Sequence, residues 1–145
     1  MGKINVSAEL PAAPEKVWAA FADPGRFEQW LTIHTKWKGD VPTEFRKGAQ
    51  VSEVVTMLGM ANTITWTVEE YDAPSRLAIS GTGMAGVKVR FTLSVEPSGT
   101  DGSTATIDAE FSGAMIVGAL GKAVEKDAGK NLTESLEKLK ALVDA

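Results

Sequence analysis

The period of the apolar residues changes along this chain, and the change limits the fold more than any other feature of the sequence. Between residues 51 and 111, apolar side chains recur at every second position, which is the period of a half-buried β-strand. From about residue 115 onward they recur at the three- and four-residue spacing of an amphipathic helix. Consecutive strands with short turns favour antiparallel pairing over crossover units. The sequence therefore predicts an α+β protein with an antiparallel sheet and one long C-terminal helix.

The individual strands follow from the same alternation. Clusters of glycine, proline, serine and aspartate separate the alternating segments, as expected for turns. Gly59 is expected to turn a hairpin between two of them. We expect strands near residues 3–10, 51–57, 63–68, 77–79, 87–95 and 105–111.

Two short helices are expected after the first strand. Pro14 suits a first helical position because it lacks an N–H that would have no partner there, and this helix should reach Phe21. A second amphipathic helix is predicted because apolar and aromatic side chains recur at offsets of three, four and seven, at Phe27, Trp30, Leu31 and His34. Residues 35–48 are polar and contain glycine and proline, so we expect a loop with a short edge strand near Trp37.

The last helix is long enough to cross the whole sheet. At about 1.5 Å per residue it spans roughly 35 to 40 Å. A single helix cannot fill the concave face of a twisted sheet, so side chains or a ligand must fill the remaining space. The apolar stripe that should face the sheet consists of Ile116, Leu120, Val124, Leu132, Leu136, Leu139 and Val143.

Composition excludes several classes of protein. The length of 145 residues suits one domain spanning residues 1–145. The absence of cysteine and the presence of one histidine argue against disulfides and metal centres, so we expect no metal. A net charge of -4 with scattered lysines argues against nucleic-acid binding. No phosphate loop, signal peptide or membrane span is apparent, so we expect no cofactor, no integral membrane association and a cytoplasmic protein. The oligomeric state stays open.

The order of these elements resembles the START-like superfamily, also called the helix-grip or SRPBCC fold. The resemblance covers the whole chain and rests on the segments 14–18 (PEKVW) and 27–30 (FEQW), the strand at Trp66, and Gly113, Gly118 and Gly121 before the last helix. Within the superfamily the chain is similar to the polyketide cyclase/dehydrase and lipid-transport group. This resemblance implies a curved sheet wrapped around the C-terminal helix and a cavity between them that binds a lipid, sterol, polyketide or other apolar molecule.

A narrower resemblance concerns an actinobacterial subgroup. Residues 30–34 (WLTIH), Trp37, Gly59–Met60 and 86–89 (GVKV) resemble a subgroup in which one member is described as the toxin of a type II toxin–antitoxin pair. The resemblance implies an antitoxin protein as a candidate partner.

Strand parity and helix period together predict which side chains line the cavity. Methionine and tryptophan suit an adaptable apolar pocket, although each of these side chains could equally be plain core. The predicted ligand-binding residues are Trp18, Trp30, His34, Val55, Met57, Trp66, Ile79, Val89, Phe91, Phe111, Leu120 and Val124.

Few polar side chains are candidates for chemistry. His34 and Glu53 are weak candidates for a catalytic acid or base; a histidine in this place can also orient a ligand or cap a helix. Parity directs Glu53 inward unless a bulge resets the register, and we favour a surface or edge position because strand ends often deviate. Asp127 and Asn131 lie one helical turn apart, either at the pocket mouth or, as we favour, on a solvated face.

Three functions remain open from the sequence. The first is binding of a small hydrophobic ligand, the second is a polyketide cyclase or aromatase, and the third is a toxin. The glycines Gly113, Gly118 and Gly121 could form a gate over the cavity or a plain turn into the helix.

Overall fold

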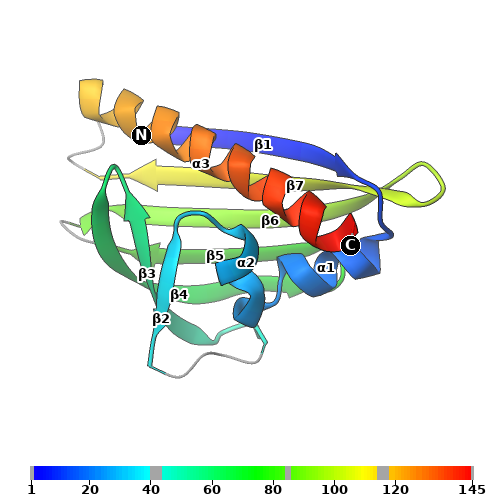
Figure 1. The fold of residues 1–145 in the computed structure, drawn as a ribbon. Helices are drawn as coiled ribbons and strands as arrows, with labels where there is room; N and C mark the ends of the chain where they lie inside the picture. The colour runs from blue at the N-terminus through cyan, green and yellow to red at the C-terminus, as the bar shows by residue number, and fades with distance from the viewer. Residues whose placement is uncertain (1, 40–43, 84–85, 114–117, 145) are drawn as a thin grey trace.

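The computed structural model describes residues 2–39, 44–83, 86–113 and 118–144 of the chain. One seven-stranded sheet, entirely antiparallel, has the order β1-β7-β6-β5-β4-β3-β2. The sheet curls into a half-barrel, and the long helix α3 lies across its concave side with α1 and α2 beside the C-terminal half of that helix (Figure 1). This architecture confirms the predicted helix-grip fold.

The elements have the following bounds in the structure. The strands are β1 (Gly2–Leu10), β2 (His34–Lys38), β3 (Gln50–Met57), β4 (Met60–Asp72), β5 (Arg76–Thr82), β6 (Lys88–Ser98) and β7 (Gly102–Ser112). The helices are α1 (Pro14–Phe21), the 3₁₀ turn η1 (Pro24–Arg26), α2 (Phe27–Trp30) and α3 (Gly118–Asp144).

The curl of the sheet depends on a close approach at Gly81. A Cβ atom at this position would lie 2.4 Å from the carbonyl oxygen of Thr65 and 2.7 Å from Cγ2 of Ile64. Only glycine tolerates such an approach by a neighbouring backbone. The strands β4 and β5 can therefore bend together towards α3.

The predicted second helix is wrong in its extent. The helix α2 ends at Trp30, since Leu31 already has an extended backbone with φ −81° and ψ 102°, and His34 begins β2. The register of β2 against β3 shifts between His34 and Lys36, which marks a β-bulge. His34 continues the helical spacing of Phe27, Trp30 and Leu31 only by coincidence, because the backbone is already extended at Leu31.

The buried face of α3 follows the predicted helical period. Its fully or nearly fully buried residues are Val124, Ala128, Leu132, Ser135, Leu136, Leu139 and Val143. Leu120 is 39% exposed and does not belong to this buried stripe. Ile116 lies outside the described residues. Among the described residues, no helix combines the length and the apolar character needed to span a membrane.

Candidate functional site

The centre of the interior holds three side chains joined by polar contacts. The Nε1–H group of Trp66 donates a hydrogen bond to Oε1 of Glu53 over 2.8 Å, and Nδ1 of His34 contacts Oε2 of the same carboxylate. The His34 and Glu53 side chains are only 4% and 2% exposed. Among the ion pairs of the described residues, none joins Glu53 to a lysine or arginine. We call His34, Glu53 and Trp66 the polar trio.

The burial of Glu53 corrects the surface position that the sequence analysis favoured. Parity alone was right, because β3 continues without a bulge through Glu53 and pairs it with Ile64 of β4. A buried carboxylate is costly unless donors satisfy it. Trp66 and His34 supply one donor to each carboxylate oxygen, so the structure resolves that cost.

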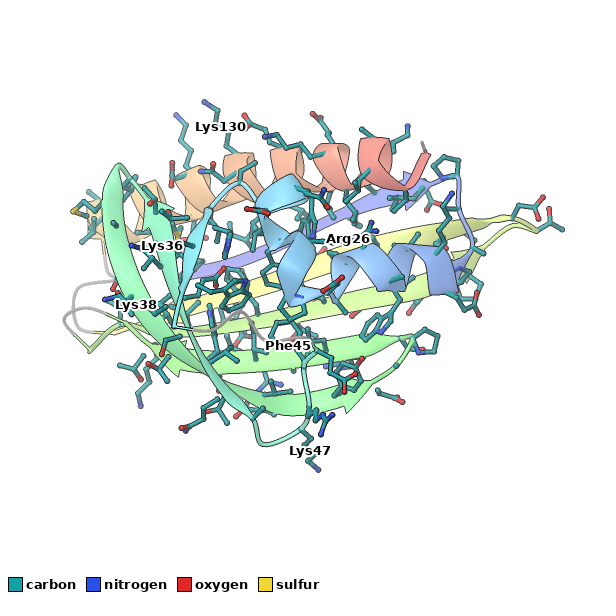
Figure 2. All side chains as sticks on the ribbon, turned by 60° about the horizontal axis from the view of Figure 1, so that its bottom comes forward. Arg26, Lys36, Lys38, Phe45, Lys47 and Lys130 are labelled. Atoms are coloured by element: carbon teal, nitrogen blue, oxygen red, sulfur yellow. The ribbon has the colours of Figure 1, made fainter. Side chains whose placement is uncertain are left out.

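Aromatic rings surround the imidazole of His34. Its ring centroid lies 6.0 Å from that of Phe27 and 5.2 Å from that of Trp37. Phe45 contacts both of these rings and is buried beneath α2, whereas Lys36 and Lys38 stand at the outer side of β2 (Figure 2). The imidazole is therefore held between a carboxylate on one side and a wall of aromatic rings on the other.

The β-bulge is what brings His34 and Trp37 to the same side of β2. With strict alternation these two residues would face opposite sides of the strand. Because Thr35 is the extra residue of the bulge, both rings turn inward and contact Phe27. The Nε1–H group of Trp37 donates to the carbonyl oxygen of Pro24 over 2.9 Å, which ties β2 to η1.

A second set of hydrogen bonds ties the segment before His34 to α3. The backbone N–H of Thr32 donates to Oγ of Ser135 over 2.9 Å, and the hydroxyl of Thr32 donates to the backbone oxygen of Asn131 over 2.9 Å. Ser135 is fully buried and also donates to the Asn131 carbonyl over 2.8 Å. We call these contacts of Thr32, Asn131 and Ser135 the Thr32 clasp.

The favoured solvated position of Asp127 and Asn131 is wrong. Asp127 accepts a hydrogen bond from the backbone N–H of Leu58 over 3.1 Å, which links α3 to the β3–β4 hairpin. Asn131 is half-buried and belongs to the Thr32 clasp. Both side chains thus fix other elements to α3.

Most of the predicted lining residues share the interior with the polar trio. Their apolar members are buried on the inner face of the sheet and on α2 and α3, and Met57 is partly buried against them. Trp66 contacts Phe91, and Phe91 contacts Phe111, with ring centroids 5.4 and 6.2 Å apart. The structure brings together Trp30, His34, Val55, Met57, Trp66, Ile79, Val89, Phe91, Phe111 and Val124 in one core.

Two predicted residues lie apart from the polar trio. Trp18 packs edge-on against Tyr71 at a centroid distance of 5.8 Å and borders a separate hollow of about 140 Å³ with Asp23 and Glu44. Leu120 belongs to the exposed first turn of α3. Of the glycines of the predicted gate, Gly113 and Gly118 have positive φ angles, of 149° and 58°, and Gly121 is buried within α3. Residues 114–117 of this segment lie outside the described part of the chain.

Two further hollows differ in volume and in position. One of about 210 Å³ lies between η1, α2 and β2 and is bordered by His34, Glu28, Lys36 and Trp37 among others. A larger one of about 490 Å³ lies on the outer face of the sheet, where hydroxyl and charged side chains such as Thr65, Thr82, Lys88 and Arg90 line it. The hollow beside His34 is the one of the two that a member of the polar trio borders.

Sequence reasoning missed several residues that build this site. Phe27 entered only as part of a helix pattern, and neither Phe45 nor Ser135 was singled out. The aromatic residue in the polar segment 35–48 was a usable signal for Phe45, because an isolated phenylalanine in a polar loop usually packs inward. Among residues 2–39, 44–83, 86–113 and 118–144, no three His, Asp or Glu side chains gather as a metal site.

A curled antiparallel sheet that holds a long C-terminal helix, with an apolar interior and one buried polar cluster, defines a protein of the START-like class. The sequence matches the family described as polyketide cyclase / dehydrase and lipid transport over residues 1–144, and the chain belongs to this family.

Individual relatives agree with this assignment. The chain is 34% identical over 137 residues to the toxin Rv0910 of Mycobacterium tuberculosis, covering 94% of each sequence. It is 32% identical over 141 residues to the uncharacterized protein Rv1546 of the same organism, covering 94% of this chain and 98% of that one. Among solved structures, a START superfamily protein from Mycobacterium smegmatis superposes with a TM-score of 0.76 at 18% identity, covering 99% and 98% of the two chains.

Proposed function

We propose that this protein binds a small hydrophobic ligand, such as a lipid or polyketide, between the inner face of the sheet and α3. The main support is the inner surface itself, which is apolar from Val55 to Phe111 except for the polar trio. Apolar walls with a few convergent polar groups are typical of small-molecule sites. The family description, which includes lipid transport, supports the same function.

Ligand panels test this proposal directly. Native mass spectrometry of gently purified protein and thermal-shift assays with lipids and aromatic polyketides should find a binder. A ligand present at 100 times its Kd stabilises the folded state by about 2.7 kcal/mol. Val124→Trp adds bulk on the sheet-facing side of α3 and should block binding there, whereas Lys126→Trp on the exposed side of α3 should not. If no apolar compound binds and Val124→Trp has no effect, the proposal is wrong.

A second candidate function is that of a polyketide cyclase or aromatase. The contact between His34 and Glu53 favours it, because a carboxylate that accepts from Nδ1 orients an imidazole as a general base. Under this hypothesis His34 moves the proton and Glu53 positions it. Unchanged turnover of every polyketide substrate by a folded His34→Gln variant would exclude this function.

A third candidate function is that of a toxin neutralised by an antitoxin. It is supported by the Mycobacterium tuberculosis relative Rv0910, which is named a toxin and matches 94% of this chain. A short reading frame next to the gene and growth arrest after induced expression, relieved by co-expression of that frame, are the expected observations. Normal growth at high expression would contradict this candidate.

A further inference from the structure

The hydrogen bonds of the polar trio determine which ring nitrogen of His34 carries the proton. They therefore restrict which ligand groups can bond to the other nitrogen. The indole of Trp66 can only donate, so it occupies Oε1 of Glu53 as an acceptor. Oε2 contacts Nδ1 of His34, and an ionised carboxylate can accept there only if Nδ1 carries the proton. In the neutral imidazole, Nε2 is then a bare lone pair.

The surroundings of His34 make this lone pair a directed acceptor. Nε2 lies on the edge of the ring opposite Nδ1, so it points away from Glu53. None of the hydrogen bonds of the described residues engages Nε2, and none of their buried side-chain N or O atoms is left without a partner. His34 is one of the residues that border the hollow of about 210 Å³ between η1, α2 and β2.

The charges around His34 determine which ligand group bonds best to Nε2. If His34 takes up a proton, Glu53 compensates the imidazolium at the shortest range available, while Phe27 and Trp37 keep the ring away from water. The neighbouring charged side chains that border the same hollow are Glu28 and Lys36, both exposed. A carbonyl cannot bond to this lone pair, because both groups are acceptors. An acidic donor that can share or release its proton gains more here than a neutral donor such as an alcohol, because charge-assisted hydrogen bonds are the stronger ones.

We infer that, provided the protein binds apolar ligands as proposed above, its ligand is an apolar weak acid whose O–H group bonds to Nε2 of His34. The shared chemistry is an acidic hydroxyl, as in a phenol, an enol or a carboxylic acid. The proton moves from the ligand oxygen towards Nε2, the electron pair stays on the oxygen, and no oxidant or reductant is involved. Glu53 and Trp66 are positioning residues, because they fix the imidazole without touching the ligand.

Matched probe pairs test this inference. Binding of 2-naphthol is compared with that of 2-methoxynaphthalene, and binding of decanoic acid with that of methyl decanoate. We expect the acid of at least one pair to bind about tenfold more tightly than its partner, a difference typical of one charge-assisted hydrogen bond. The pair that shows the difference identifies the phenol or the carboxylic acid as the source. Equal binding within both pairs overturns the inference and leaves the proposed function intact. If no apolar compound binds at all, both the inference and the proposed function are wrong.

Variants separate the roles within the polar trio. His34→Gln should abolish the preference for the acid. Glu53→Gln should do the same although His34 remains, because the Gln amide can donate to Nδ1 and so move the proton to Nε2. The exposed Glu110→Gln serves as the matched control and should keep the preference. A preference that persists in both His34→Gln and Glu53→Gln overturns the inference.

The single histidine gives a readout that does not depend on folded variants. Because His34 is the only histidine in the 145 residues, its imidazole ¹⁵N signals need no assignment in protein without a histidine tag. We expect a protonated Nδ1 in the free protein and a large shift of Nε2 when the acid probe binds. Binding of the acid without any change at Nε2 overturns the inference.

Discussion

Replacement of Glu53 by Leu tests the stability of the polar trio. The carboxylate is 2% exposed and serves two buried donors, so its removal leaves Nε1 of Trp66 and Nδ1 of His34 without their acceptor. Each unsatisfied donor costs about 1–3 kcal/mol, so two such donors together cost about 2–6 kcal/mol. We expect the free energy of unfolding to fall by an amount in the middle of this range, about 3–5 kcal/mol, which lowers the midpoint of thermal unfolding by about 10–15 °C in a chain of this size.

Urea unfolding followed by tryptophan fluorescence and far-UV circular dichroism measures this change. The slope of the free energy against urea should stay constant, so that the midpoint alone reports stability. Adding His34→Leu to Glu53→Leu removes one orphan donor, and the double variant should therefore lose about 1–3 kcal/mol less than the sum of the single variants. The reasoning is refuted if Glu53→Leu stays within about 0.5 kcal/mol of the parent, as an exposed substitution does, or if the two effects simply add.

Four further predictions follow from single contacts. Gly81→Ala forces a Cβ to 2.4 Å from the Thr65 carbonyl and should cost about 3 kcal/mol in urea unfolding; a stable variant would show that the close approach does not set the curl. Gly129→Ala, whose Cβ would have ordinary contact at 3.8 Å in the middle of α3, should stabilise by about 0.5–1 kcal/mol, and a loss would contradict that geometry. Thr32→Val removes the hydroxyl of the Thr32 clasp and should cost about 1 kcal/mol, with a matching rise in amide exchange at His34; unchanged exchange would argue against the clasp. Hydrogen bonds from Ser98 and then Thr104 lower the pKa of Glu9, so the contribution of Glu9 to folding stability is full above pH 4.5 and is lost as the pH falls through the folded-state pKa. The Glu9→Gln variant should therefore lose less stability on acidification than the parent protein. An unchanged dependence of stability on acid pH would contradict this.

The fold was predictable from the sequence because one face of the sheet is buried. Period-two alternation from Val51 to Phe111 fixes which side chains face α3, and a slip of one residue would expose the whole set. The site was less predictable, since the partners of Glu53 come from strands 19 and 13 residues away in sequence. Parity could point Glu53 inward, but only the three-dimensional structure shows that His34 and Trp66 meet it there.

The segment after Trp30 shows where the local pattern failed. His34 keeps the helical spacing of Phe27, Trp30 and Leu31, but the backbone is already extended at Leu31, and spacing over so short a segment does not reveal this. The helical assignment of His34 was therefore wrong although its inward orientation was right.

The two edge strands of the sheet are protected by different means against pairing with a strand of another molecule. Strand β1 is flanked by α3, close enough that a Cβ on Gly2 would lie 3.0 Å from the Glu125 side chain. In the described part of the chain, α3 does not flank β2 as it flanks β1, but β2 spans only five residues, is interrupted by its bulge and presents the exposed Lys36 and Lys38. Short, bulged and charged borders resist the addition of a strand from another molecule. Even at high protein concentration, copies of this chain should therefore not polymerise by extending one sheet into the next.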